Sequence, residues 1–116
     1  MITAVFFAET SGEQTNWSGF LLDGHADLDE AGRDILCAAV SALAQTVLMG
    51  LTEVVKLPTK WDRDEGYLSV RLDPGSVGDA GANVLLETVY LALEDLAKQY
   101  PDRLGIRISY SNGRGR

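Results

Sequence analysis

An uncharged stretch from Ile35 to Thr52 is the feature that most constrains the fold of this 116-residue chain. Aliphatic residues recur within it at the spacing of one helix face, at Leu36, Val40, Leu43, Val47 and Leu51. Serine, glutamine and threonine interrupt the stretch, which favours a helix inside a soluble domain over a membrane span. Because Ala38, Ala42 and Met49 lie on the opposite face, we predict a helix over residues 34–51 that is buried on more than one side.

A second helix and four strands complete the predicted elements. The helix covers residues 77–100, begins at an N-cap on Ser76 and stops before Pro101, and its apolar stripe consists of Leu85, Val89, Leu93, Leu96 and Tyr100. Strands are predicted over residues 2–8, 17–22, 67–72 and 105–110, with a weaker candidate at 54–57. Packing both helices on one face of a mostly antiparallel sheet is the simplest way to bury both stripes. We therefore predict an α+β, two-layer sandwich with a four- to five-stranded sheet.

Composition limits the partners and the location of the protein. The length suits a single domain, over residues 1–110, and the polar, glycine-rich residues 111–116 are expected to form a disordered tail. A formal net charge of -7 argues against nucleic-acid binding, which depends on neutralising phosphates. One cysteine cannot form a disulfide within the chain, and the N-terminal apolar run is too short for a signal peptide. We expect a cytoplasmic protein.

Cys37 is the one cysteine of the chain and His25 is the one histidine. Asp34 is a candidate N-cap, and in that interpretation Cys37 lies in the first helical turn, where the helix dipole favours a thiolate. Helical spacing puts Cys37, Ser41 and Gln45 together on the flank of the apolar stripe. His25 follows a predicted strand, and loops at strand ends often hold catalytic groups. A nucleophile and its base are therefore one hypothesis for this pair.

Other interpretations of these residues stay open. A lone cysteine in an apolar helix is often an inert core residue, and a histidine beside aspartates is often a solvated loop residue. One histidine, one cysteine and scattered carboxylates do not make a closed zinc site, and residues 23–34 lack the ligand spacing of a calcium loop. The glycines form no phosphate-binding motif. The sequence therefore predicts neither a metal nor a cofactor.

The residues around this pair resemble a family signature. The bacterial ribosomal-processing cysteine proteases of the Prp family have a signature similar to two runs of this chain, Gly24-His25-Ala26 and Gly32-x-Asp34-Ile35-Leu36-Cys37-Ala38-Ala39-Val40-Ser41-Ala42. The spacing from histidine to cysteine is the same, and Leu36 conservatively replaces the usual valine. The resemblance extends over nearly the whole chain, from Met1-Ile2-Thr3 to the predicted last strand.

The resemblance implies a cytoplasmic α+β thiol protease, often a homodimer, that removes a short N-terminal extension from a large-subunit ribosomal protein. The cut would follow a hydrophobic stretch that ends in two phenylalanines. By matching positions, Cys37 is the nucleophile and His25 the general base and later general acid, with Asp34 and Ser41 in supporting positions. No single residue stands out to orient the imidazole, for which Asp23, Asp27 and Asp34 are candidates.

Two further expectations concern the mechanism. Backbone N–H groups at the start of the first helix, helped by Ser41, would hold the oxyanion. The polar loop over residues 26–33 would close on the substrate. Two alternative functions remain at this point: a non-catalytic dimeric module for ribosome assembly or binding, and an RNA-binding factor, which the negative charge disfavours.

Overall fold

The computed structural model describes residues 1–24 and 31–112, and of residues 31–34 and 112 it describes the backbone alone. The elements follow in the order β1 (Ile2–Ser11), β2 (Gln14–Gly24), α1 (Ala31–Met49), β3 (Thr59–Asp64), β4 (Tyr67–Leu72), α2 (Ala80–Gln99) and β5 (Leu104–Asn112). A π-helical turn, Gly50–Val54, continues α1, and a short 3-10 turn, Pro74–Ser76, precedes α2.

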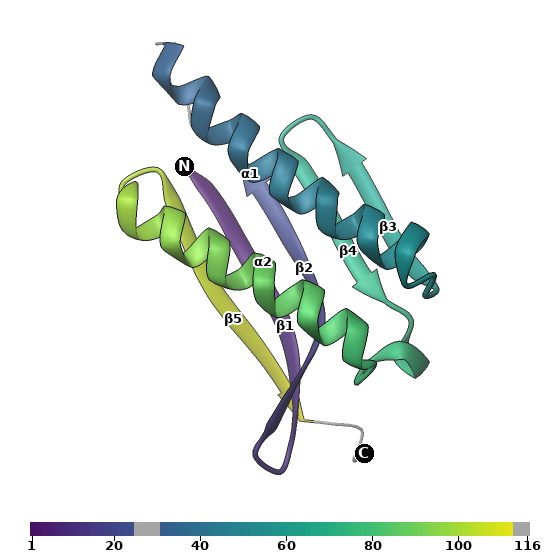
Figure 1. Cartoon of the computed structure of the whole chain (residues 1–116). Coiled ribbons are helices and arrows are strands. Elements are labelled where there is room, and N and C mark those ends of the chain that lie inside the picture. The colour runs from purple at the N-terminus through teal and green to yellow at the C-terminus, as the bar shows by residue number, and fades with distance from the viewer. Residues whose placement is uncertain (25–30, 113–116) are drawn as a thin grey trace.

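The strands of the described chain form one sheet in the order β3-β4-β2-β1-β5. β1 runs parallel to β5, and the other neighbouring pairs are antiparallel. Both helices lie across the same face of this sheet, with α1 over the β4 side and α2 over the β1 and β5 side (Figure 1). The predicted α+β two-layer sandwich is confirmed, and the sheet has five strands.

The core fills the space between the sheet and the two helices. Side chains alternate along β1, and the buried set that faces the helices is Ile2, Ala4, Phe6 and Ala8. The predicted stripes supply the opposite wall, where the buried residues are Leu36, Val40, Val47 and Leu51 from the first helical segment and Val89 and Leu93 from α2. Leu43, Leu85 and Leu96 are only partly buried, and Tyr100 is exposed. Helical periodicity therefore identified most of the helix side of the core.

The outer face of α1 is apolar but exposed. Ile35 is 68% exposed and Met49 is 59% exposed, and Ala38 and Ala42 are exposed between them. The prediction that this helix is buried on more than one side is wrong, because the sheet covers one side of α1 and no element of the described chain covers the other. By length and composition, Ile35–Val54 is also apolar enough to cross a membrane. Its buried stripe instead packs on the sheet.

The helix starts differ from those predicted. α1 begins at Ala31, so residues 31–33, predicted to be loop, are helical. α2 begins at Ala80, and its N-cap is Asp79, whose carboxylate Oδ2 accepts a hydrogen bond from the Ala82 N–H at 3.0 Å. Ser76 belongs to the preceding 3-10 turn instead. The chain needs that turn to leave β4, which delays the start of α2.

The strand bounds also differ from those predicted. Residues 50–54 form a π-helical turn, so no strand occupies residues 54–57, and the additional strand is β3 at Thr59–Asp64. β5 continues through Ser111 and Asn112, which were expected to lie in the tail, because it pairs with β1 as far as Thr10. The rest of the expected tail, residues 113–116, lies outside the described residues.

Candidate active site

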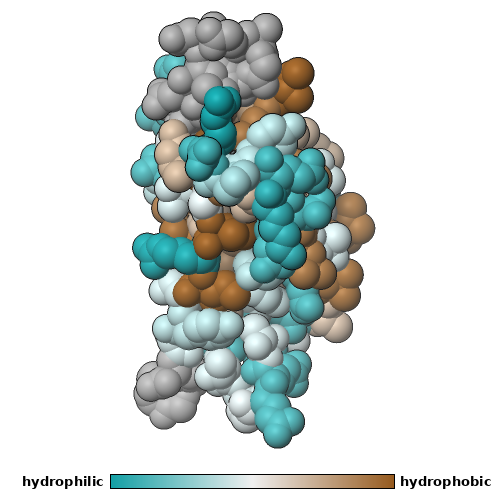
Figure 2. Space-filling view, turned by 90° about the vertical axis from the view of Figure 1, so that its left-hand side faces the viewer, coloured by the Kyte–Doolittle hydropathy of each residue, from teal (hydrophilic) through white to brown (hydrophobic). Residues whose placement is uncertain are grey.

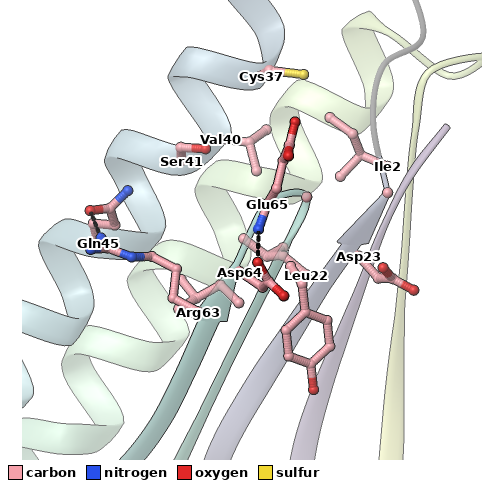
Figure 3. A pocket seen from close by; sticks show the side chains of 14 residues that line it. Ile2, Leu22, Asp23, Cys37, Val40, Ser41, Gln45, Arg63, Asp64 and Glu65 are labelled. Atoms are coloured by element: carbon pink, nitrogen blue, oxygen red, sulfur yellow. Dashed lines mark hydrogen bonds between the residues drawn. The ribbon is translucent and has the colours of Figure 1, made fainter.

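A pocket of about 400 Å³ lies between α1, the ends of β1 and β2, and the hairpin formed by β3 and β4. Its floor is apolar and consists of Ile2, Leu22, Val40 and Leu68, all of them core residues. Its rim is polar and comes from α1 on one side and from the hairpin on the other (Figure 3). The pocket thus combines an apolar surface with groups that can take part in proton transfer and hydrogen bonding.

Cys37 lines this pocket from α1 and is a free, partly buried thiol. Ser41 and Gln45 follow one and two turns further along the helix, and both also line the pocket. In Figure 3 the Cys37 sulfur lies at one end of the pocket and Gln45 at the other. The polar stripe that the sequence predicted on the flank of the core face therefore forms one wall of the cavity.

The start of α1 changes the surroundings expected for Cys37. The described part of α1 begins at Ala31, so Asp34 lies inside the helix, and Cys37, six residues after Ala31, lies beyond the first turn. The expectation that Asp34 is the N-cap and that Cys37 lies in the first turn is wrong. The N–H of Cys37 is then used within the helix, and the dipole effect is weaker beyond the first turn. Activation of this thiol therefore depends more on a neighbouring base than the sequence suggested.

His25 lies outside the described residues, but Gly24, the residue before it, is described and lines the same pocket as Cys37. The Gly24 N–H donates a hydrogen bond to the Gly66 carbonyl oxygen at 2.9 Å, which ties the end of β2 to the turn between β3 and β4. Its φ of +111° favours glycine, and a Cβ atom at this position would lie 2.3 Å from the Met1 carbonyl oxygen. Local geometry therefore requires a glycine directly before the histidine.

The candidates to orient the imidazole are only partly described. Asp23 lines the pocket from β2. Asp27 lies outside the described residues, and the side chain of Asp34 is not described. The loop predicted to close on the substrate, residues 26–33, likewise lies largely outside the described residues, except where α1 begins.

The β3–β4 hairpin supplies pocket residues that sequence reasoning missed. Arg63 Nη1 donates a hydrogen bond to Gln45 Oε1 at 2.7 Å, and the Glu65 N–H donates to Asp64 Oδ1 at 2.8 Å within the turn (Figure 3). Gly66 has a φ of +70° and completes the turn. The sequence Asp64-Glu65-Gly66, directly before an alternating strand, was a hairpin signal that could have identified these residues.

Among the described residues, the charges that line the pocket are mainly negative. Asp23, Asp64 and Glu65 line it together with one cation, Arg63. In Figure 3 the Glu65 side chain rises from the hairpin toward the Cys37 end of the pocket. Among the described residues, no group of three histidine, cysteine or carboxylate side chains is arranged to hold a metal ion. A raised pKa occurs away from the pocket lining, at Tyr90, where burial and then the neighbouring Glu94 disfavour the phenolate.

Residues 1–105 match the sequence model of a family described as cysteine protease Prp. A ribosomal processing cysteine protease Prp of Staphylococcus aureus is 28% identical over 113 residues, which cover 95% of this chain and 99% of that protein. The match therefore includes the segment that carries both His25 and Cys37.

Solved structures share the fold over nearly the full length. The essential ribosomal processing protease Prp from Staphylococcus aureus, in complex with a covalently linked product peptide, has a TM-score of 0.77 and 25% identity, and the match covers 96% of this chain and 100% of that chain. SMU.848 from Streptococcus mutans has a TM-score of 0.77 and 27% identity, with 96% of each chain covered.

Proposed function

The chain belongs to the Prp family of cysteine proteases, and we propose that it removes an N-terminal extension from a large-subunit ribosomal protein. The cut would follow a hydrophobic stretch that ends in two phenylalanines. One observation carries this proposal: Cys37 and Gly24, the residue before His25, line the same pocket. His25 is therefore bonded directly to a residue of the pocket lining.

The proposed reaction uses Cys37 and His25 in two steps. His25 takes the proton from Cys37 Sγ, and the thiolate attacks the carbonyl carbon of the scissile bond. The C–N bond breaks, the leaving amine takes the proton from the imidazolium, and a thioester remains. A water molecule then gives a proton to His25 and attacks the thioester carbon. The C–S bond breaks, and the sulfur recovers its proton.

Ser41 is the proposed side-chain donor to the oxyanion. Its hydroxyl lines the pocket one turn after Cys37 and is exposed to an incoming substrate. The Cys37 N–H is engaged within α1, so the backbone donors expected at the helix start would have to come from its first turn. A single oxyanion donor contributes about 3 kcal/mol to lowering the barrier. We therefore expect Ser41→Ala to slow cleavage without abolishing it.

The apolar floor supports the proposed substrate. Leu22, Val40 and Leu68 line the same pocket as the thiol with aliphatic side chains, and an aromatic or aliphatic peptide segment can bury its surface against them. A solved relative is described as a ribosomal processing protease bound to a covalently linked product peptide. Extended to this chain, that description supports a peptide substrate held in the same pocket.

We also propose that the protein acts in the cytoplasm, as a homodimer, on a protein partner rather than on nucleic acid. The net charge of -7 disfavours contacts with phosphates. The exposed apolar side chains of α1 and α2 offer a surface for a second copy. Apolar atoms are visible along the helix-covered side of the molecule, at the right of Figure 2.

Cleavage of the ribosomal protein precursor tests the proposed activity. The purified chain is incubated with a precursor that carries the N-terminal extension, and the products are weighed by mass spectrometry. Wild type should release the extension in one cut after the two phenylalanines. Cys37→Ala should leave the precursor intact while keeping the circular dichroism spectrum and the midpoint of thermal unfolding. An intact precursor with wild type, or cleavage by Cys37→Ala, would contradict the proposal.

A further inference from the structure

The length of the pocket wall formed by α1 follows from the spacing of its residues along the helix. Cys37, Ser41 and Gln45 lie four residues apart along the helix and all line the cavity. At a rise of 1.5 Å per residue, Gln45 lies about 12 Å along the axis from Cys37. Val40 lies between them on the floor, with Leu22 and Leu68 opposite it on the sheet. Between the thiol and Gln45 the pocket therefore has an aliphatic floor, bordered by the polar side chain of Ser41.

A hydrogen bond crosses the pocket at its far end. Arg63 Nη1 donates to Gln45 Oε1 at 2.7 Å, and this contact joins α1 to the edge strand β3. Arg63 pairs in register with the core residue Leu68, so it lies on the helix-facing side of the sheet. Figure 3 shows this contact, the Gln45–Arg63 bridge, at the end of the pocket opposite the Cys37 sulfur.

The partner of Arg63 is unusual for this pocket. Three carboxylates line the same cavity, yet in the described part of the chain the side chain of Arg63 bonds to the neutral Gln45 amide. A hydrogen bond donated by a charged group is shorter and stronger than a neutral one. Both residues are nevertheless exposed, so the bridge can be displaced by a substrate at a moderate cost.

We propose that the Gln45–Arg63 bridge is a specificity element that ends the substrate groove. The inference rests on the proposed protease function and adds a limit on how many substrate residues before the cut the groove can hold. An extended peptide advances about 3.3 Å per residue, so three to four residues span the axial separation of about 12 Å between Cys37 and Gln45. The residues before the cut lie on the aliphatic floor, and a bulky side chain at the fourth position before the cut meets the bridge.

Peptides that differ only at the fourth residue before the cut test this inference. The ratio of kcat/KM for alanine to kcat/KM for tryptophan at that position measures the discrimination. Gln45→Ala and Arg63→Ala should each lower the ratio at least threefold, mainly through the KM of the tryptophan peptide. The double variant should lower it no further, because both changes remove the same contact. Gln45→Glu should raise the ratio, because a carboxylate strengthens the bridge.

Arg107→Ala is the matched control, since Arg107 is an exposed arginine on β5 outside the pocket lining and its loss should leave the ratio unchanged. An unchanged ratio in Gln45→Ala and Arg63→Ala, or an equal change in Arg107→Ala, overturns the inference and leaves the protease function standing. Failure of wild type to cut any peptide of the series overturns the protease function, and the inference with it.

Discussion

Gly24 fixes the point from which the chain enters the segment that carries His25. Its φ is +111°, and a Cβ atom would lie 2.3 Å from the Met1 carbonyl oxygen, so a larger residue must displace β1 or the end of β2. Its N–H also ties β2 to the β3–β4 turn. One residue thus combines a conformational and a packing requirement at the wall of the pocket.

We predict that Gly24→Ala lowers the free energy of unfolding by about 2 kcal/mol. Gly12→Ala is the matched control, because Gly12 also has a positive φ, +65°, but nothing lies within 4 Å of an added Cβ atom. Gly12→Ala should cost about 1 kcal/mol, from backbone strain alone. Urea denaturation of the two variants measures the difference. Equal stabilities would mean that the close approach to Met1 does not constrain this position.

The sequence identified one wall of the pocket but not the other. Cys37 and Ser41 were singled out because helical spacing puts them on one polar stripe, and the structure places both on the pocket. Arg63 and Glu65 were missed because the pairing of β3 with β4 places them across the pocket from α1. The hydrogen bond from Arg63 to α1 joins positions that are distant in sequence. Asp34 was predicted to be the N-cap, just before the helix, but it lies inside α1. Acidic residues are favoured both at the N-cap and near the start of a helix, so the sequence does not distinguish the two positions.

Among the helices and strands, the N-cap of α2 is the clearest local contact. Asp79 Oδ2 accepts a hydrogen bond from the Ala82 N–H at 3.0 Å, which satisfies one of the donors left free at the helix start. Asp79→Ala should lower the free energy of unfolding by about 1 kcal/mol. Ser76→Ala should change it by less than about 0.5 kcal/mol, because Ser76 lies in the preceding turn. Thermal or urea unfolding measures both, and a larger loss for Ser76→Ala would contradict this assignment of the cap.

The two helices were predictable because their buried stripes repeat over many turns, whereas β3 was not. β3 is an edge strand whose side chains are exposed or only partly buried, so it shows no alternation of apolar and polar residues. β4 alternates buried and more exposed residues and was predicted with the same bounds that it has in the structure. Periodicity therefore predicted the two helices and β4, each of which buries one face, and it missed β3, which does not.

The two-layer architecture followed from two amphipathic helices that each need a sheet face. The extent of burial did not follow, because Ile35 and Met49 on α1, and Val84 and Leu91 on α2, are more than half exposed. Composition records that a residue is apolar but not whether this chain or another one covers it. The apolar outer face of the helix layer is the feature that supports the proposed homodimer.

We predict a solution mass of twice the chain mass of 12.5 kDa. Leu91→Glu should shift the protein toward monomer, because it puts a charge on the outer face of α2, where Leu91 is 54% exposed. Thr3→Glu is the control, since Thr3 is exposed and alternates on β1 with the buried, helix-facing residues Ile2 and Ala4, so it lies on the opposite face of the sheet. Sedimentation equilibrium measures the masses. A monomer at every concentration, or a dimer that Leu91→Glu leaves intact, would contradict an interface on the helix layer.

We propose that His25 activates the Cys37 thiol at the pocket that Cys37 and Gly24 both line. The most direct test is the rate at which iodoacetamide alkylates Cys37 between pH 5 and pH 9, in wild type and in His25→Ala, with Gln45→Ala as a variant of another pocket residue. At neutral pH we predict that wild type and Gln45→Ala react faster than a free thiol and that His25→Ala reacts at least about tenfold more slowly than wild type. Equal rates in wild type and His25→Ala across this range would contradict the claim.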